Sequence, residues 1–225
     1  MNSLTVLAHV KTPPALIAPN GEKQVAACSV EIAAYKQEDP PMVLRVTAWG
    51  DLATDAMQCI QVDTYLILTG RLRIEKGKLP EFQIADFHRV GAPVDRPGIN
   101  AVSIVGRAGR DTEARYFESG NMVANLSLAV NRASRDDEPD WFNLEIWGKQ
   151  AQIATDYVRK GSLLGIIGSF RLETWTDRSS GEERSKPVIR VDRLELLGSR
   201  KDSEGGGFAG GGNCAGEPSE EEVPF

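Results

Sequence analysis

The chain has 225 residues, 41% of them hydrophobic, which is enough for one large or two small packed domains. It has neither an apolar run long enough to span a membrane nor the basic start and apolar segment of a signal peptide, so we expect a cytoplasmic protein without membrane contact. Three widely spaced cysteines, Cys28, Cys59 and Cys214, indicate neither a disulfide framework nor a metal site.

The distribution of charge matters more than the formal net charge of −6, which by itself argues against a nucleic-acid partner. Residues 1–98 hold 10 Lys and Arg against 11 Asp and Glu, residues 99–200 hold 15 against 15, and residues 201–225 hold 1 against 6. The corresponding net charges are −1, 0 and −5. The acidity is therefore concentrated in the tail, and the arginine-rich middle segment can still form a basic groove.

An internal repeat with a spacing of 98 residues divides the chain. We predict two copies of one domain, residues 1–92 and 99–200, joined by a Pro- and Gly-containing linker at residues 93–98. Residues 201–225 contain a glycine-rich stretch followed by a glutamate-rich one, which predicts a disordered tail. The matching pairs are Asn2 and Asn100, Trp49 and Trp147, Ala53 and Ala151, and Gly70 and Gly168.

The predicted elements of each copy are strands with one short helix. In the first copy a helix is expected at residues 51–62. In the second copy strands are expected at 100–107, 122–131, 141–147, 162–171 and 187–197, with a helix at 149–160. Three strands, a helix and two strands follow the order of an OB-fold, a five-stranded barrel. We therefore predict an all-β chain of two tandem OB-fold barrels, with a generic small β-barrel as the alternative.

Residues 140–149 contain the clearest functional signal. Alternation with a period of two divides this strand into an apolar face and a solvent-facing one. Two tryptophans on a solvent-facing strand indicate a platform on which nucleic-acid bases stack, and the alternative is a subunit interface or a loop that covers them. The apolar face has Phe142, Leu144 and Ile146, and the other face has Trp141, Asn143, Glu145 and Trp147.

Short motifs follow one another along the second copy: Val-Gly-Arg at 105–107, Glu-Ala-Arg-Tyr at 113–116, Ala-Asn-Leu-Ser-Leu-Ala at 124–129, Trp-Gly-Lys at 147–149 and Tyr-Val-Arg-Lys-Gly at 157–161. After a glycine-rich segment, the chain ends with Glu-Glu-Glu-Val-Pro-Phe. Residues 99–198 with this tail resemble the bacterial single-stranded DNA-binding proteins, whose acidic tip is usually Asp-rich and followed by Ile-Pro-Phe. The resemblance implies sequence-independent binding and protection of single-stranded DNA in replication, recombination and repair.

The resemblance also implies roles for individual residues. Trp141, Trp147 and Trp175 occupy positions where the family places base-stacking aromatics. The phosphates of the bound DNA are expected to lie along basic residues of the second copy. The loops at 109–121, 132–140 and 173–186 could cover the bound DNA strand. The expected phosphate contacts are Lys149, Arg159, Lys160 and Arg171, extended by Arg115, Arg132 and Arg135.

Two assembly features follow from the same resemblance. In the family the acidic tip recruits replication and repair proteins, and four OB domains assemble together. Two copies per chain therefore imply a homodimer, with the protein associated with the nucleoid. The expected partner-binding residues are Glu220, Glu221, Glu222, Val223, Pro224 and Phe225.

Both copies depart from the family pattern. In the second copy, Ser134 lies near the position where many family members have another stacking tryptophan. Asn143 and Glu173 stand where basic residues are frequent in the family. In the first copy only Trp49 of the three stacking positions remains. The first domain is therefore expected to be mainly structural, with weak DNA contact. The other 98-residue matches place Val43 opposite Trp141, Gly77 opposite Trp175, Asp51 opposite Lys149, and Gln61 and Val62 opposite Arg159 and Lys160.

An enzymatic function is not indicated. The two histidines, His9 and His88, lie far from cysteines, and no phosphate-binding glycine loop, metal-ligand spacing or nucleophile elbow occurs. We therefore expect no cofactor and no metal. The alternatives to a single-stranded DNA binder are an OB-fold interaction scaffold with weak DNA binding and a single-stranded RNA binder, since stacking barely distinguishes the two sugars.

Overall fold

A computed structural model describes residues 1–17, 24–32, 41–74, 79–90, 98–118, 120–132, 138–176, 181 and 183–198, with the side chains of residues 174, 175 and 183–185 also left out. The first copy contains β1 (Asn2–Val10), β2 (Ala15–Ile17), β3 (Val25–Ile32), β4 (Met42–Trp49), α1 (Asp51–Cys59), β5 (Tyr65–Arg73) and β6 (Glu81–Val90). The second contains β7 (Asn100–Ala108), β8 (Glu113–Tyr116), β9 (Met122–Val130), β10 (Asp140–Trp147), α2 (Gly148–Tyr157), β11 (Leu163–Thr176) and β12 (Glu183–Leu196).

Each copy closes into a five-stranded barrel, as predicted. In the first, the pairings run β1–β3–β4–β6–β5 and back to β1, with β4 and β6 parallel. The second repeats this ring as β7–β9–β10–β12–β11. Alternating strand residues fill both interiors, among them the fully buried Phe82, Phe142 and Phe170. Each helix packs against its barrel through two buried alanines, Ala53 and Ala56 or Ala151 and Ala154.

Several predicted boundaries were wrong. The helices end at Cys59 and Tyr157, earlier than residues 62 and 160, because the backbone is already extended at the following residue. The expected loop at 109–121 contains β8. Residues 173–186, expected as a loop or a polar hairpin, continue the β11–β12 ladder as far as Thr176 and Glu183. Apart from Trp175, polar residues form this extension, so no alternation between apolar and polar residues marks it.

Gly70 and Gly168 recur at the repeat spacing because a β-bulge lies there in both copies. The register shifts between Thr69 and Gly70 in one barrel and between Ile167 and Gly168 in the other. A Cβ atom at either glycine would lie 2.1 Å from a carbonyl oxygen of the neighbouring strand. Only glycine therefore permits this close approach of two backbones.

Two other repeat positions have equally local causes. The amide of Asn2 donates to the Leu72 carbonyl at 2.8 Å, and that of Asn100 donates to the Phe170 carbonyl at 2.8 Å. The glycine after each repeated tryptophan, Gly50 or Gly148, has a positive φ of 62° or 58°, which turns the strand into the helix. These asparagines and glycines therefore recur in both copies because the same backbone geometry is needed at each position.

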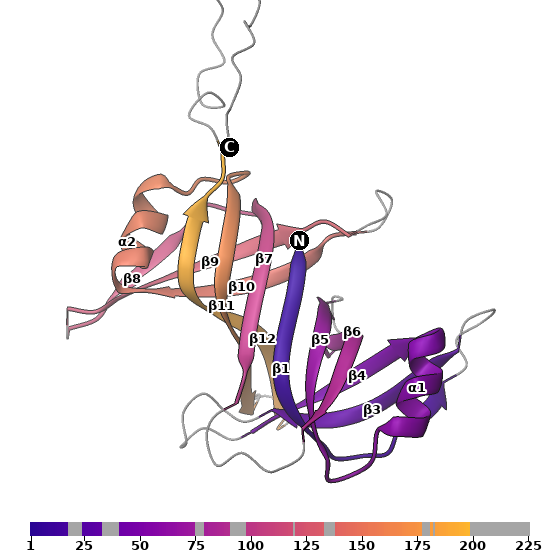
Figure 1. The fold of residues 1–225 in the computed structure, drawn as a ribbon. Helices are drawn as coiled ribbons and strands as arrows, with labels where there is room; N and C mark the ends of the chain where they lie inside the picture. The colour runs from indigo at the N-terminus through magenta and orange to yellow at the C-terminus, as the bar shows by residue number, and fades with distance from the viewer. Residues whose placement is uncertain are drawn as a thin grey trace, which may run out of the picture.

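The two barrels are joined through β1 and β7, which pair antiparallel between them (Figure 1). Leu4 lies opposite Val102, and 102 − 4 = 98, so equivalent residues of the two copies face each other at the centre of the ladder. The pairing is therefore related by an approximate two-fold axis. It creates a continuous run of strands in the order β6–β5–β1–β7–β11–β12, with α1 and α2 at opposite ends of the molecule.

Parts of the predicted organisation lie outside the described residues. They include most of the linker at 93–98 and the whole tail at 201–225, so the domain boundaries stay predictions. In the described part of the chain, no helix is long and apolar enough to cross a membrane.

Candidate nucleic-acid interface

β10 presents its two tryptophans to solvent, as the alternation predicted. Trp141 is 47% exposed and Trp147 is 37% exposed, whereas Phe142, Leu144 and Ile146 are at most 1% exposed. β10 lies between β9 and β12, so the tryptophans are held on a central strand of the barrel wall. A rigid strand with large exposed rings at both ends suits stacking with flat ligands.

The Trp147 ring is held by two neighbours. It stacks on Phe117, with ring centroids 5.8 Å apart and an angle of 8° between the planes, and its Nε1 donates to Glu145 Oε1 at 2.5 Å. Phe117 is 48% exposed and the preceding Tyr116 is 70% exposed, so the aromatic surface continues beyond the strand. Neither residue was predicted as part of the stacking surface, although two adjacent aromatics after Arg115 were a usable signal.

Trp141 lies against the backbone of the turn that follows β7. A Cβ atom at Gly109 would come within 2.4 Å of Cζ3 of the Trp141 ring. Gly109 is itself fixed by a hydrogen bond from its N–H to the Ser127 carbonyl at 2.8 Å. The missing side chain at Gly109 therefore lets the indole lie close to the backbone, which limits its motion.

The third predicted stacking residue, Trp175, lies in the extended arm of β11, where its backbone pairs with Arg184 of β12. Its side chain lies outside the description. β11 and β12 are each longer than the equivalent strands β5 and β6. The residue numbers of Gly70 and Gly168 differ by 98, whereas those of their cross-strand partners Ile84 and Val191 differ by 107. The arm is thus an insertion of 107 − 98 = 9 residues that the first copy lacks.

Some of the predicted cations share the face of the tryptophans. Arg115 of β8 lies opposite Val123, which lies opposite Trp147, so these three residues form one cross-strand row. In the same way Arg171 of β11 lies opposite Val188, which is paired with Asn143. Lys149 is exposed one residue after Gly148.

Other predicted cations lie elsewhere. The Arg159 guanidinium donates to the carbonyls of Thr155, Asp156 and Val158 at 2.9–3.1 Å, so it caps the C-terminus of α2. Together with Lys160 it lines a groove of about 560 Å³. Arg132 forms an ion pair with the buried Asp140 at 2.9 Å. Ser134 and Arg135 lie outside the described residues, as do the six residues of the predicted tip.

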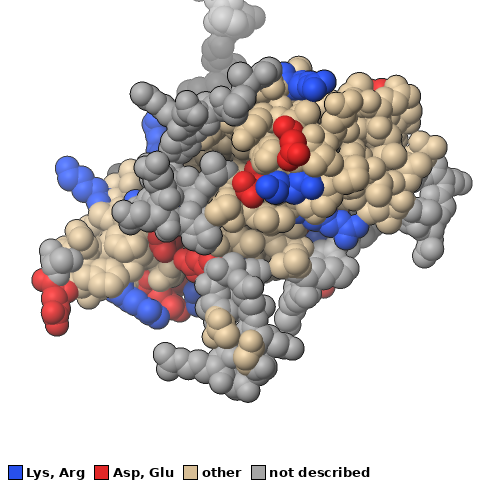
Figure 2. Space-filling model, turned by 90° about the horizontal axis from the view of Figure 1, so that it is seen from below, with Lys and Arg blue, Asp and Glu red and all other residues tan. Residues whose placement is uncertain are grey.

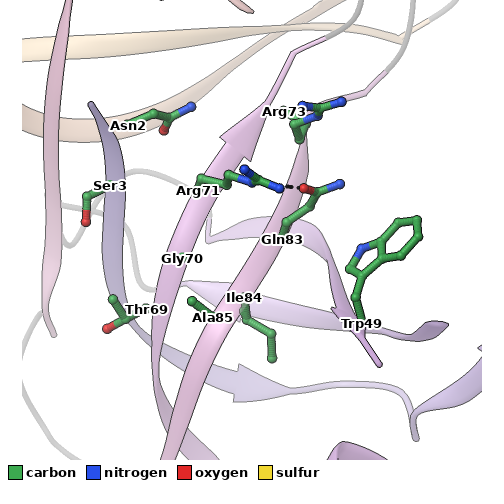
Figure 3. A pocket seen from close by; sticks show the side chains of 10 residues that line it. All are labelled: Asn2, Ser3, Trp49, Thr69, Gly70, Arg71, Arg73, Gln83, Ile84 and Ala85. Carbon is green, nitrogen blue, oxygen red and sulfur yellow. Dashed lines mark hydrogen bonds between the residues drawn. The ribbon is translucent and has the colours of Figure 1, made fainter. Parts of the chain in front are cut away.

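The equivalent face of the first copy retains one tryptophan and several arginines. Trp49 is 42% exposed, and Val43 replaces Trp141. A pocket of about 760 Å³ extends from Trp49 across Gln83 to Arg71, Arg73 and Asn2 (Figure 3). The Arg71 Nε donates to Gln83 Oε1 at 3.1 Å. This face therefore keeps positive charge after losing most of its stacking surface.

The charge pattern and donor groups narrow the possible chemistry. On the face shown in Figure 2, Lys and Arg are interspersed with Asp and Glu, so this face carries no single large basic field. Within the described ranges, no group of three or more His, Cys, Asp or Glu residues could hold a metal ion.

Comparison with known proteins agrees with this geometry. The profile of the Single-strand binding protein family matches residues 99–197. The Single-stranded DNA-binding protein of Thermosynechococcus vestitus is 59% identical over 107 residues, which is 48% of this chain and 89% of that protein. The Single-stranded DNA-binding protein 1 of Synechocystis sp. is 61% identical over 107 residues, 47% of this chain and 88% of that protein.

The chain belongs to the single-strand binding protein family.

A solved structure extends the comparison to both copies. The crystal structure of the wild-type single-stranded DNA binding protein from Thermus aquaticus covers 92% of this chain and 97% of its own, with a TM-score of 0.69 and 20% identity. At this identity the match shows a shared fold. The predicted all-β fold and the resemblance to this family, whose members are non-enzymatic, are therefore confirmed. The roles of individual site residues stay predictions.

Proposed function

We propose that this protein binds single-stranded DNA without reading its sequence and protects it during replication, recombination and repair. The observation that carries the proposal is the pair of exposed tryptophans on β10, each held in place by its neighbours. Stacking on aromatic rings tolerates any base and contributes about 1–3 kcal/mol per base. Sequence-tolerant binding follows because no base edge has to be read.

The proposed contact surface combines stacking and phosphate contacts. Trp141 and Trp147 form its centre, with Trp175 on the arm and Tyr116 and Phe117 beside Trp147. Arg115 and Lys149 contact phosphates along this face. Arg132, Arg159, Lys160 and Arg171 stay predicted contacts: Arg132 and Arg159 also bind groups of the protein, the Nε and Nη2 atoms of Arg171 are buried, and Lys160 lines the groove beside Arg159. Phosphate contacts make affinity fall with salt, with a slope of about −0.7 per contact for single strands.

The proposal is tested by titrating the protein with poly-dT while following tryptophan fluorescence, with poly-U as competitor. We expect strong quenching that weakens as salt rises, and weaker competition by poly-U. Equal competition by poly-U would favour an RNA-binding role, and unchanged fluorescence at low salt would favour a protein-interaction scaffold.

We further propose that the first copy is mainly structural and contacts DNA weakly. Val43 and Asp51 stand where the second copy has Trp141 and Lys149, which supports this proposal. In the full chain, Trp49→Ala is expected to reduce poly-dT affinity less than Trp147→Ala does. An equal loss in both variants would contradict the division of labour.

We also propose that residues 220–225 recruit replication and repair proteins. Three glutamates followed by Val223, Pro224 and Phe225 suit a basic-rimmed apolar pocket of a partner. Deleting Phe225 should leave poly-dT affinity unchanged and abolish capture of repair proteins from a lysate. Retained capture after the deletion would refute this role.

Finally, we propose a homodimer that brings four barrels together. The outer face of the run β5–β1–β7–β11 carries small and apolar side chains, including Thr5, Ala101, Ser103 and the 50%-exposed Ile167. Charged side chains of this run, such as Arg71 and Arg107, lie away from these residues towards strand ends, so its small and apolar centre suits pairing with a second copy.

A further inference from the structure

A small pocket of about 260 Å³ lies where the two copies meet near the start of β1. It is lined by Asn2, Arg71 and Arg73 of the first copy and by Asn131, Arg132 and Asp140 of the second. Three guanidinium groups thus share the pocket with one carboxylate. We call this site the seam pocket.

The carboxylate of Asp140 is already satisfied by other groups. It accepts hydrogen bonds from Arg132 Nη2 at 2.9 Å and Nε at 3.2 Å, and from the Ile74 N–H of the first copy at 3.0 Å. Its side chain is 4% exposed. Asp140 therefore forms an ion pair with Arg132 and does not pair with Arg71 or Arg73.

Arg71 and Arg73, the other two arginines of the seam pocket, are not neutralised by Asp140. Arg71 donates to the neutral amide of Gln83. Among the described residues, no carboxylate forms an ion pair with Arg73. Arg71 and Arg73 extend from neighbouring positions of β5 between Asn2 and Trp49 (Figure 3). Two cations at alternate positions of one strand suit an anionic ligand.

The approximate two-fold axis provides an internal comparison, because it creates a second seam. There the Leu172 N–H donates to Met42 Sδ at 3.1 Å, and these residues match Ile74 and Asp140, since 172 − 74 = 98 and 140 − 42 = 98. At the same spacing Arg71 corresponds to Ser169. Arg132 likewise corresponds to Ala34, so only the arginine pair Arg73 and Arg171 keeps its charge in both seams.

We infer that a bound single strand leaves the Trp141 end of the second copy and crosses to the first copy over the seam pocket, where Arg71 and Arg73 hold its phosphates. Asp140, which lines the pocket, directly precedes Trp141. The pocket shares Asn2, Arg71 and Arg73 with the larger pocket that extends to Trp49. The ligand class is the phosphodiester backbone, and the inference rests on the proposed single-stranded DNA binding.

The crossing is asymmetric because one seam carries three arginines, whereas the other keeps only Arg171 of the three equivalent positions. The first copy then contributes phosphate contacts there without base stacking, which agrees with its weak predicted affinity. A short oligonucleotide confined to the second copy does not reach Arg71 or Arg73, whereas a longer one does. The length of the oligonucleotide therefore separates the seam from the rest of the interface.

The test compares Arg71→Gln and Arg73→Gln in the full chain with oligo-dT of about 8 and about 30 nucleotides, since one OB-fold covers about 4–16 nucleotides. Arg89→Gln is the matched control, because Arg89 is exposed on β6 of the same copy and lines neither pocket. Affinities are measured from 0.1 M to 1 M salt by tryptophan quenching. Thermal melting monitored by circular dichroism confirms that each variant is folded.

For the long oligonucleotide we expect the slope of log affinity against log salt to become shallower by about 0.7 in each variant. Over this decade of salt, that change corresponds to binding about fivefold weaker at 0.1 M. The short oligonucleotide and Arg89→Gln should behave as the wild type. If Arg73→Gln unfolds the protein, the salt dependence of Arg71→Gln alone tests the inference, because Arg71 is exposed and its replacement should not disturb the fold.

Unchanged slopes with the long oligonucleotide would overturn the seam crossing. A loss that Arg89→Gln reproduces, or that the short oligonucleotide shows equally, would also overturn it. Failure of the wild type to bind either oligonucleotide is a different result, because it contradicts the proposed function itself.

Discussion

At the scale of single residues, Trp147 shows how neighbours prepare an aromatic ring for stacking. Phe117 lies against it and Glu145 accepts its indole N–H, so two contacts fix a side chain that is still 37% exposed. A ring that is already ordered loses less conformational entropy when a base stacks on it. Stacking on Trp147 should therefore contribute fully to affinity.

Replacing Trp147 by Ala should weaken poly-dT binding by about 1–3 kcal/mol, because one stacked base loses its partner. Trp147→Phe should retain most of the affinity, since a phenyl ring still offers a stacking face. Isothermal titration calorimetry at fixed salt measures both variants. Equal losses for Ala and Phe would show that stacking is not what this side chain provides.

A second prediction at this scale concerns the cysteines. Burial raises the pKa of the Cys28 thiol to about 11, whereas Cys59 is exposed. A raised pKa keeps the folded protein in the unreactive thiol form at pH 8, and folding is destabilised only as the pH rises from about 9 towards 11. In a Cys214→Ser background, an aromatic disulfide reagent at pH 8 should modify Cys59 quickly and Cys28 only after denaturation. Rapid modification of two thiols in the native protein would contradict the burial of Cys28.

At the scale of elements, prediction succeeded where a strand has one buried face. β10 was recognised because Phe142, Leu144 and Ile146 alternate with exposed residues, and each helix was located by its apolar spacing. β8 was missed, and the outer part of the β11–β12 arm was expected as a loop or a polar hairpin. In β8 only Ala114 packs partly against the core, and the arm sequence is mostly polar, so hydrophobic periodicity carries little information about either.

The bulge glycines give a prediction about stability. Gly168→Ala should lower the free energy of unfolding by about 1–3 kcal/mol, because its Cβ would meet the Arg190 carbonyl oxygen at 2.1 Å. Gly165→Ala in the same strand is the control, since its Cβ would meet Leu197 Cδ1 at 3.3 Å. Urea denaturation compares the two. A Gly168→Ala variant as stable as Gly165→Ala would show that the bulge is not needed.

At the scale of the whole molecule, the repeat predicted two barrels, and the pairing between them could not be foreseen. The pattern of β1 and β7 shows which side chains enter each core, but strand edges bond through backbone groups that are the same for every residue. The contact between Asp140 and Ile74 was missed for a related reason. Asp140 lies at a strand start, where a carboxylate usually faces solvent, and its burial depends on the Ile74 N–H of the adjoining copy together with Arg132 of its own copy.

The proposed dimer gives a prediction at the same scale. Ile167→Glu places a charge on the outer face of the continuous strand run, so it should convert the dimer to a monomer without changing the melting temperature of each chain greatly. Sedimentation equilibrium measures the mass. The control is Ile153→Glu, because Ile153 is an exposed residue of α2 away from that face. A dimer that persists in Ile167→Glu would place the interface elsewhere.

Single-stranded DNA binding by the second copy is the central claim, and tryptophan fluorescence during titration with poly-dT tests it most directly. The exposed positions of Trp141 and Trp147 predict strong quenching at low salt, a steep loss of affinity as salt rises, and a weaker signal in Trp147→Ala. Fluorescence that stays constant at every poly-dT concentration in low salt would contradict the claim.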